Sequence, residues 1–262
     1  MPYIEGVPET SERARGREDP KETLRVRLTD APGDYLDGAL DNPSLGPDEL
    51  VVLLRSREVG SETIARVGRN RSWLRHREVK LALVNSPRAP QVLARRLLPH
   101  LTWRDLADVA ANLRLSPILR REAERLLTTR LPELAVGEKM ALARRGGRGI
   151  VEMLREETDG LVLQAVAGNP RATEADVSRM VSRADAPAAF LAWVADRSSW
   201  GARRSVRLAL VRHPRTPAAV SLGLTRLLSR RDAEELRHDF AAPRLVRVAA
   251  ERLLADAGAS LG

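Results

Sequence analysis

Residues able to carry out acid–base, nucleophilic or metal chemistry are few in this sequence, and they are widely spaced. Its 262 residues include four histidines and no cysteine. The absence of cysteine excludes disulfides, thiolate metal sites and a cysteine nucleophile. No histidine has a metal-ligating residue three or four positions further along the chain; the four are His76, His100, His213 and His238. We therefore expect no metal, no cofactor, no small-molecule substrate and no catalytic centre, so the sequence predicts a protein that is not an enzyme.

Arginine is the chemically active residue that the chain has in excess. The net charge is +9, and lysine occurs only at Lys21, Lys80 and Lys139. Because the planar guanidinium binds phosphates and carboxylates through two parallel hydrogen bonds, this excess favours an acidic partner. The alternative is that arginine simply replaces lysine throughout the chain and carries no function.

The positions of these arginines carry more information than their number. Residues 66–88 sum to a charge of +6 and residues 193–215 to +5. The predicted partner-binding residues come from these two segments: Arg69, Arg71, Arg75, Arg77, Lys80, Arg203, Arg204 and Arg207. The alternative is a solvated basic face, or ion pairs formed within the fold.

The elements that must hold these arginines are short helices. From residue 34 onward, amphipathic stretches alternate with breakers of two to five residues, and aromatic residues make up only 3% of the chain. Such a composition favours helices that pack through aliphatic side chains over sheets rich in aromatic residues. Three helix starts show capping-box spacing, in which a hydroxyl and a carboxylate satisfy free N–H groups. The pairs are Thr102 with Asp105, Thr173 with Asp176, and Ser229 with Asp232.

The sequence therefore predicts an all-α fold. The predicted helices span about 34–41, 47–56, 61–69, 74–85, 90–99, 103–111, 117–129, 137–145, 149–157, 160–168, 174–183, 187–195, 201–211, 217–228, 230–239 and 243–257.

Much of the chain occurs twice, in such a way that residue n aligns with residue n + 127. Val79–Pro90 aligns with Val206–Pro217, Trp73 aligns with Trp200, and no gap is needed from about 36 to 127. Because each helix is too short to be stable alone, neighbouring helices must stabilise one another. We expect an α-solenoid of short helix pairs, built as two tandem, pseudo-equivalent copies. The residues expected to be buried at equivalent places are Leu81, Leu83 and Val84 with Leu208, Leu210 and Val211.

The repeat also predicts the domain boundaries. Residues 1–33 are rich in proline and charge and are expected to form a flexible N-terminal tail, with a weak strand-like alternation at Leu24, Val26 and Leu28. Residues 34–130 form copy one, and residues 131–262 form copy two, continuous with the first. No run of apolar residues is long enough to span a membrane, and no signal peptide is apparent. We therefore expect a cytoplasmic protein.

Two sequence elements carry a resemblance to known helical-repeat proteins. They read V-R-L-A-L-V-x-x-P-x-T-P at 206–217 and G-N-P-x-x-T-E-x-D-V at 168–177. With Gly137–Arg145, they are similar to HEAT-like and leucine-rich-repeat-variant-like bacterial α-helical repeat proteins of uncharacterised function. The resemblance covers most of 36–257 and implies a solenoid fold, with the activity left open. The proline marks at 43, 87, 170 and 214 are more widely spaced than the units of the repeat-variant family.

Charge and resemblance together predict a non-enzymatic interaction scaffold. Its partner would be a nucleic acid or an acidic protein, bound through the duplicated basic faces. One alternative follows from the HEAT-like alkylpurine DNA glycosylases, which combine groove tryptophans with an acid to excise alkylated bases. The residues available for that chemistry are Trp103, Trp193 and either Asp105 or Asp196. The other alternative is a protein–protein adaptor whose charge is incidental.

Overall fold

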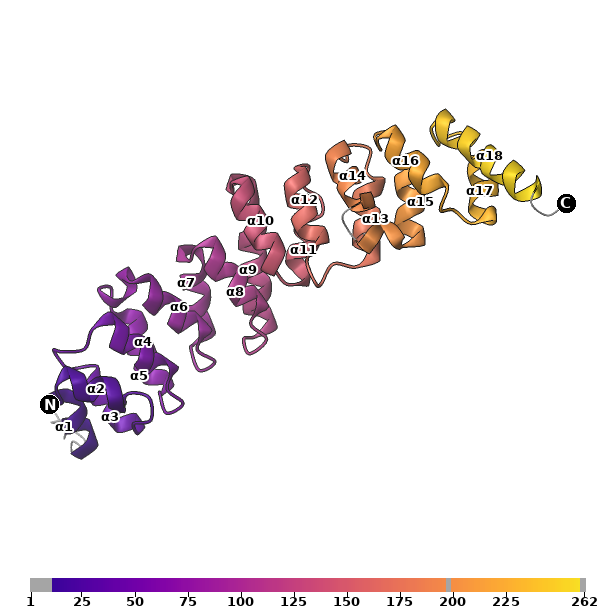
Figure 1. Cartoon of the computed structure of the whole chain (residues 1–262). Coiled ribbons are helices and arrows are strands. Elements are labelled where there is room, and N and C mark those ends of the chain that lie inside the picture. The colour runs from indigo at the N-terminus through magenta and orange to yellow at the C-terminus, as the bar shows by residue number, and fades with distance from the viewer. Residues whose placement is uncertain (1–10, 197–198, 260–262) are drawn as a thin grey trace. The chain divides into compact units, whose positions relative to one another are not determined.

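The structure is a computed structural model, which describes residues 11–196 and 199–259. The described residues form short helices and no strand, which confirms the all-α prediction. The α-helices are α1 (Ser11–Glu18), α2 (Lys21–Arg27), α3 (Gly33–Ala39), α4 (Pro47–Arg55), α5 (Ser61–Arg69), α6 (Arg77–Asn85), α7 (Gln91–Leu97), α8 (Trp103–Ala111), α9 (Pro117–Arg130), α10 (Val136–Arg145), α11 (Arg148–Leu154), α12 (Gly160–Ala167), α13 (Glu174–Ser182), α14 (Ala188–Asp196), α15 (Arg204–Arg212), α16 (Ala218–Thr225), α17 (Arg230–Arg237) and α18 (Arg244–Ala259). Figure 1 shows them along the chain. Within the described ranges, no helix has the length and apolar character needed to cross a membrane.

Local chemistry sets many of the helix starts. The hydroxyls of Thr102 and Thr173 accept hydrogen bonds from the backbone N–H of the third residue of α8 and α13, respectively. The carboxylate of that residue accepts a hydrogen bond from the backbone N–H of the threonine. Ser229 caps α17 by accepting from the Asp232 amide. These caps satisfy N–H groups that a helix start leaves without an internal partner. The predicted capping boxes are therefore confirmed for α8 and α13, whereas α17 has the serine cap without the carboxylate half of the box.

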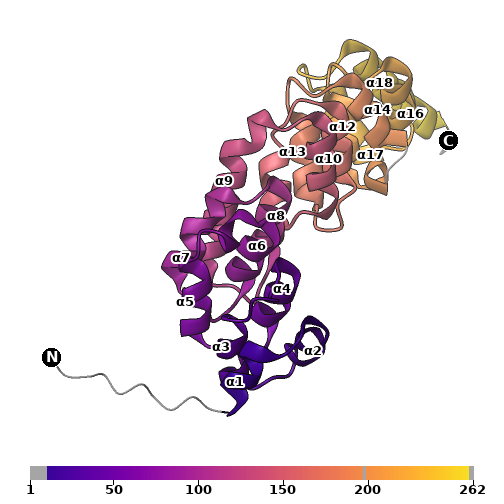
Figure 2. The ribbon, with the colours of Figure 1, turned by 90° about the vertical axis from the view of Figure 1, so that its left-hand side faces the viewer.

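The chain divides into two compact units, residues 1–130 (unit 1) and residues 131–262 (unit 2). In unit 1, α4, α6 and α8 lie in one row while α5, α7 and α9 lie in the other (Figure 2). Helix α2 packs against α4 at the start of the first row, and α1 packs against α3.

Unit 2 has the same kind of internal order. Helices α10, α12, α14, α16 and α18 pack against one another in sequence, and α13 packs against α15. In Figure 1 the first set runs along the upper side of the unit and α11, α13, α15 and α17 along the lower side. Helices therefore contact the next helix but one as well as their neighbours in the chain.

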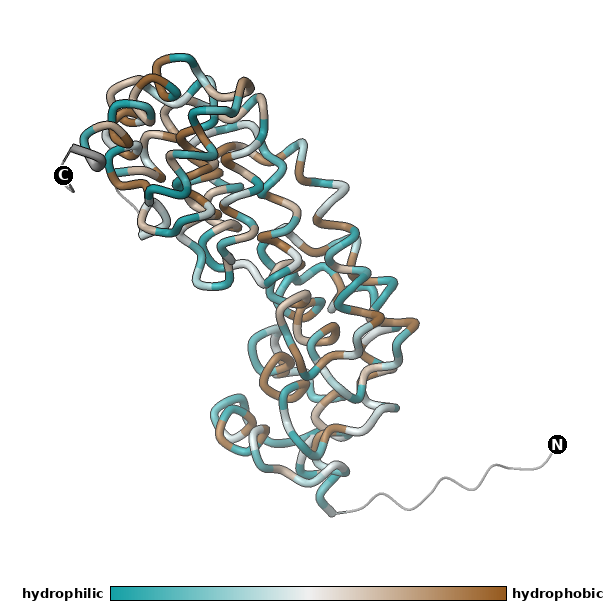
Figure 3. The backbone as a smooth tube through the Cα atoms, turned by 90° about the vertical axis from the view of Figure 1, so that its right-hand side faces the viewer, coloured by the Kyte–Doolittle hydropathy of each residue, from teal (hydrophilic) through white to brown (hydrophobic). Residues whose placement is uncertain are grey.

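The core of each unit is aliphatic. Hydrophobic and hydrophilic residues alternate along most of the helices (Figure 3), so most helices have one face for burial. Leu83 and Val84 in α6, and their counterparts Leu210 and Val211 in α15, are fully buried. Of the six residues expected to be buried, Leu81 differs, because it is only half-buried.

The prediction of a flexible tail over residues 1–33 is wrong for residues 11–33, whereas residues 1–10 lie outside the described residues. Leu24 and Leu28 are fully buried, and Val26 is 79% exposed. The two leucines are four residues apart and share one face of a helix, so the alternation that resembled a strand belongs to α2. The proline and charge content of this segment suggested a tail, but it forms helices α1 and α2, which are held mainly by contacts with α3 and α4.

Helices α1 and α3 cross at very short range. Gly16 and Gly38 lie at the crossing, and a Cβ on either one would collide with backbone of the other helix. Asn42 locks the crossing, because its Nδ2 donates to the carbonyls of Gly16 at 3.0 Å and Asp19 at 2.9 Å. These contacts make α1 an integral part of unit 1.

Candidate functional site

Two of the predicted binding arginines form ion pairs with buried acids of their own unit. Arg77, the first residue of α6, binds both carboxylate oxygens of Asp105, with Nε 2.9 Å from Oδ2. Arg204, the first residue of α15, binds Asp232 in the same manner, with Nε 3.0 Å from Oδ1. Both acids are almost completely buried. The charges expected on a partner-binding face are therefore neutralised within each unit, as in the alternative of internal ion pairs.

These pairs belong to a regular series, which we call the ion-pair ladder. Each member joins a base at the first position of a helix to a buried acid at the third position of a helix 28 residues on. A buried carboxylate is stable only when paired, so each pair fixes two helix starts relative to each other. The ladder consists of Lys21 with Glu49, Arg77 with Asp105, Arg148 with Asp176, and Arg204 with Asp232.

Asp176 is the most strongly held acid of the ladder. Arg148 donates to it through both terminal nitrogens, and Arg155 Nη1 donates to Oδ1 at 2.7 Å. The Arg148 hydrogen bonds lower the pKa of Asp176 far below its usual range, against the opposing effect of burial. The hydrogen bond from Arg204 likewise lowers the pKa of Asp232. Both carboxylates are thus ionised structural groups.

The other predicted binding residues have mixed roles. Arg207 donates to the carbonyl oxygens of Leu227 at 2.7 Å and Ala202 at 3.0 Å, so it also stabilises the fold. Arg69 lies 3.7 Å from Glu62 in an exposed ion pair. The side chains of the remaining four make no hydrogen bond or ion pair with a described residue: Arg71, Arg75 and Arg203, which are exposed, and Lys80, which is half-buried.

A different cluster of arginines surrounds a hollow of about 650 Å³ in unit 1. The hollow lies between the C-terminal ends of α4 and α6 and reaches the turn after α8. Four arginines and no acid line it. We call this site the arginine hollow; its arginines are Arg55, Arg57, Arg88 and Arg114.

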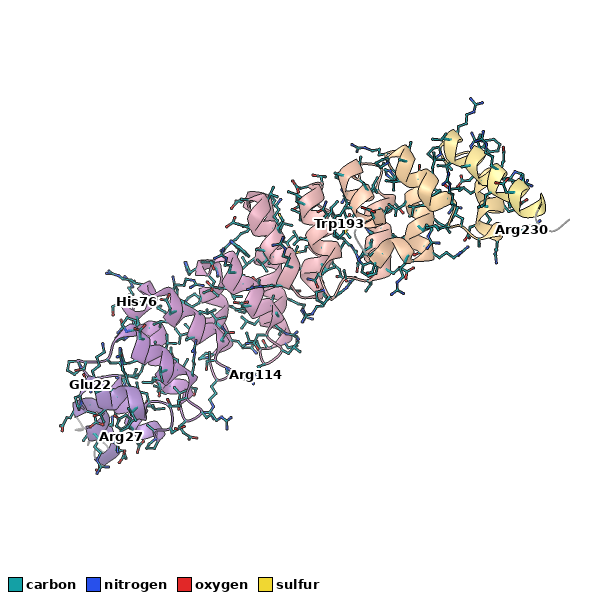
Figure 4. The ribbon with its side chains drawn as sticks, in the orientation of Figure 1. Glu22, Arg27, His76, Arg114, Trp193 and Arg230 are labelled. Carbon is teal, nitrogen blue, oxygen red and sulfur yellow. The ribbon has the colours of Figure 1, made fainter. Side chains whose placement is uncertain are left out.

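Successive turns carry these arginines. Arg57 follows α4, Arg88 follows α6, and Arg114 follows α8, where Figure 4 shows it at the lower edge of unit 1. Arg88 donates to the carbonyl of Val59 at 2.9 Å. The other three are exposed, and their side chains make no hydrogen bond or ion pair with any described residue. The site thus presents several uncompensated guanidinium groups.

Unit 2 has a hollow of about 560 Å³ at the corresponding place, between α13 and α15. Ser182 and Ala184 stand there as the repeat counterparts of Arg55 and Arg57. The arginines that line it, Arg204 and Arg212, are paired with Asp232 and Asp239, respectively. This hollow has a similar form and lacks the uncompensated charge.

The residues of the glycosylase alternative fall in both units, with Trp103 and Asp105 in unit 1 and Trp193 and Asp196 in unit 2. Asp105 is buried and bound by Arg77 and Thr102, so it is not available to a substrate. Trp193, on α14 (Figure 4), lines a separate hollow of about 500 Å³ together with Asp196. Asp196 is exposed there.

Sequence reasoning missed the arginine hollow because it summed charge over segments. The relevant signal was positional: Arg57, Arg88 and Arg114 each lie one or two positions after Ser56, Ser86 or Asn112, where a helix has just ended. The ladder had a signal too, since its residues recur at intervals of 28. The prolines used to mark the repeat, at 43, 87, 170 and 214, do not recur every 28 residues and so did not indicate that interval.

No family model matches the sequence, and no curated protein or solved structure is significantly similar to it.

Proposed function

We propose that the chain is an α-solenoid of two tandem copies, each made of one leading helix and four helix pairs. Helix bounds support this arrangement: α4, α5 and α6 span Pro47–Arg55, Ser61–Arg69 and Arg77–Asn85, and α13, α14 and α15 have the same bounds with each residue number raised by 127. The leading helices are α1 and α10. This reading extends copy one to include residues that were expected to be a tail.

Hydrogen bonds repeat at the same offset. Asn169 Nδ2 donates to the carbonyls of Ala143 at 2.6 Å and Gly146 at 3.1 Å, which are the counterparts of the bonds made by Asn42. Asn112 Nδ2 donates to Asn85 Oδ1 at 3.0 Å. The counterparts of Asn85 and Asn112 are Arg212 and Asp239, which form an ion pair. The same contact is therefore made by a hydrogen bond in unit 1 and by an ion pair in unit 2. Such atom-level recurrence supports duplication of a folded unit.

The function we infer is that of a non-enzymatic interaction scaffold that binds an acidic partner at the arginine hollow. The observation that carries this inference is the uncompensated charge of Arg55, Arg57 and Arg114. Cations at helix C-termini are stabilised by the helix dipole, so a purely structural role must be considered. The counterparts in unit 2 are Ser182, Ala184 and Ala241; α13 ends at the residue equivalent to the end of α4, and α17 ends one residue before the equivalent of the end of α8. The fold therefore does not require arginine at these places.

This function predicts that replacing the three arginines by their unit 2 counterparts removes binding. The variant is Arg55→Ser, Arg57→Ala and Arg114→Ala, and the measurement is the affinity of the whole chain for labelled acidic peptides and oligonucleotides at low and moderate salt. We expect wild-type affinity to fall as salt rises, because exposed charges are screened. The variant should bind at least about tenfold more weakly, since lost charge-assisted hydrogen bonds contribute on the order of 1.5–3 kcal/mol each.

A matched control removes the same charge elsewhere. Arg71→Ala, Arg75→Ala and Arg203→Ala delete three exposed arginines of the basic faces predicted from the sequence. Helical circular dichroism should be unchanged in both triple variants, because exposed side chains contribute little to stability. Loss of binding in the control alone would show that the partner binds at the basic faces predicted from the sequence. Binding that is independent of salt and of both triple changes would favour an adaptor with incidental charge.

A further inference from the structure

We propose that the occupant of the arginine hollow is an acidic peptide segment that inserts an aliphatic side chain between the arginines. This inference rests on the proposed function and specifies the partner at the same site. It follows from what lies beside the charged groups, which the charge alone does not determine.

Aliphatic and polar side chains share the lining of the hollow beside the arginines. Leu54, Val59 and Ala82 are already buried, so the accessible aliphatic surface belongs to Leu81, which is half-buried, and Pro87, which is exposed. The polar residues of the lining are Ser56, Asn85, Ser86 and Asn112. An apolar surface of this kind gains free energy only when an apolar group covers it. A bare polyanion would leave it exposed to water.

Two exposed aliphatic residues lie close to Arg114 in the sequence. Leu113, next to Arg114, is 81% exposed, and Ile118 at the start of α9 is 50% exposed. Side chains of this size are common on protein surfaces when isolated, but here they follow closely on the residues that line the hollow. The segment that follows α8 therefore carries both exposed aliphatic side chains and a guanidinium group that can bind a carboxylate.

Single-stranded nucleic acid fits this surface poorly. Proteins that bind single strands stack the bases on aromatic side chains within a basic groove. No aromatic residue lines the arginine hollow. Trp73 precedes α6 and Trp103 begins α8, so both stand at the ends of these helices that are away from the hollow. The hollow thus has the charge of such a groove and lacks its stacking platform.

A nucleic-acid duplex fits it no better. Duplex binding depends on basic side chains that meet phosphates along a rigid, broad surface. Contact with phosphates would leave the accessible aliphatic surface of Leu81 and Pro87 without an apolar partner. A peptide has both groups that the site requires: carboxylates that accept two hydrogen bonds from a guanidinium, and an aliphatic side chain that enters the hollow.

Fluorescence anisotropy with the whole chain tests this proposal. The probes are a short labelled peptide rich in aspartate and glutamate with one central leucine, the same peptide with serine in place of leucine, and a labelled oligothymidylate. We expect the leucine peptide to bind about tenfold more tightly than the serine peptide, which corresponds to burial of one aliphatic side chain. The Arg55→Ser, Arg57→Ala and Arg114→Ala variant should lose binding to both peptides, and the Arg71→Ala, Arg75→Ala and Arg203→Ala control should keep it.

The outcomes separate this proposal from the proposed function. Equal affinity for the two peptides, with loss in the hollow variant, overturns the aliphatic insertion and leaves the acidic-partner function standing. Tighter binding of oligothymidylate than of either peptide, again lost in the hollow variant, identifies a nucleic-acid partner and also overturns it. If no probe binds at low salt, both the inference and the proposed function fail.

Discussion

At the scale of single residues, the same side-chain type serves two purposes that the sequence alone does not separate. Arg77 and Arg57 are both exposed arginines near helix ends. Arg77 stands at a helix start and meets a buried acid, whereas Arg57 stands after a helix end and lines a hollow that contains no acid. Net charge over a segment cannot distinguish them, because the acid that pairs with Arg77 lies outside the segment. Three of the four ladder acids, Asp105, Asp176 and Asp232, were predicted as capping residues, whereas Glu49 was not. Their second role as ion-pair partners required the tertiary structure.

The ladder predicts a large loss of stability for Asp176→Ala. This change leaves Arg148 and Arg155 without their buried counter-charge and removes a helix cap. We expect the free energy of unfolding to fall by about 3 kcal/mol, the low end for a broken buried pair, because Arg148 is partly exposed to water. Denaturant unfolding measures it. Glu152→Ala, which removes the exposed carboxylate on Arg148, should cost about 0–1 kcal/mol.

The pH dependence provides an independent check on Asp176. Because its folded-state pKa lies below the usual value, its contribution is fully present above about pH 4 and is lost as the pH falls through the folded-state pKa. Wild-type stability should therefore decrease below about pH 4, and Asp176→Asn should flatten that decrease. An unchanged acid profile in the variant would show that the pair does not stabilise the fold.

At the scale of elements, helix positions were largely predictable and the N-terminal helices were not. The structure places α5 and α8 at the bounds predicted from the sequence, 61–69 and 103–111. Those segments carry clear amphipathic periodicity, and α8 also carries a cap; both signals act locally. Helices α1 and α2 have weak local signals, because α1 has almost no buried face of its own beyond Gly16. Their stability comes from packing on α3 and α4, which a local pattern does not report.

The close crossing of α1 and α3 predicts that Gly38→Ala weakens the packing of α1 on α3. The added Cβ meets the carbonyl of Arg13, which is backbone and cannot move aside as a side chain does. We expect a loss of about 1–3 kcal/mol, the usual result of overpacking, with faster hydrogen exchange at residues 11–18. Gly223→Ala is the control, since a Cβ there meets nothing within 4 Å. Normal exchange protection of α1 in Gly38→Ala would contradict the crossing.

At the scale of the whole molecule, the division at residues 130 and 131 predicts two independently folding halves. Each unit has its own aliphatic core and its own ladder pairs. Fragments 1–130 and 131–262 should each give helical circular dichroism and a cooperative thermal transition, as expected for repeat arrays stabilised by neighbouring helices. If one fragment is unfolded alone but folded in the whole chain, its stability depends on the other half.

The ladder makes the charge at helix starts alternate from one helix pair to the next. Along each unit the ladder positions are evenly spaced and alternate in sign: Lys21, Glu49, Arg77 and Asp105 in the first unit. Excising one helix pair would bring two like charges to adjacent helix starts, whereas excising two pairs would restore opposite charges. The smallest segment that such a protein can gain or lose without electrostatic conflict is therefore two helix pairs. An array of this kind is expected to lengthen and shorten in even steps.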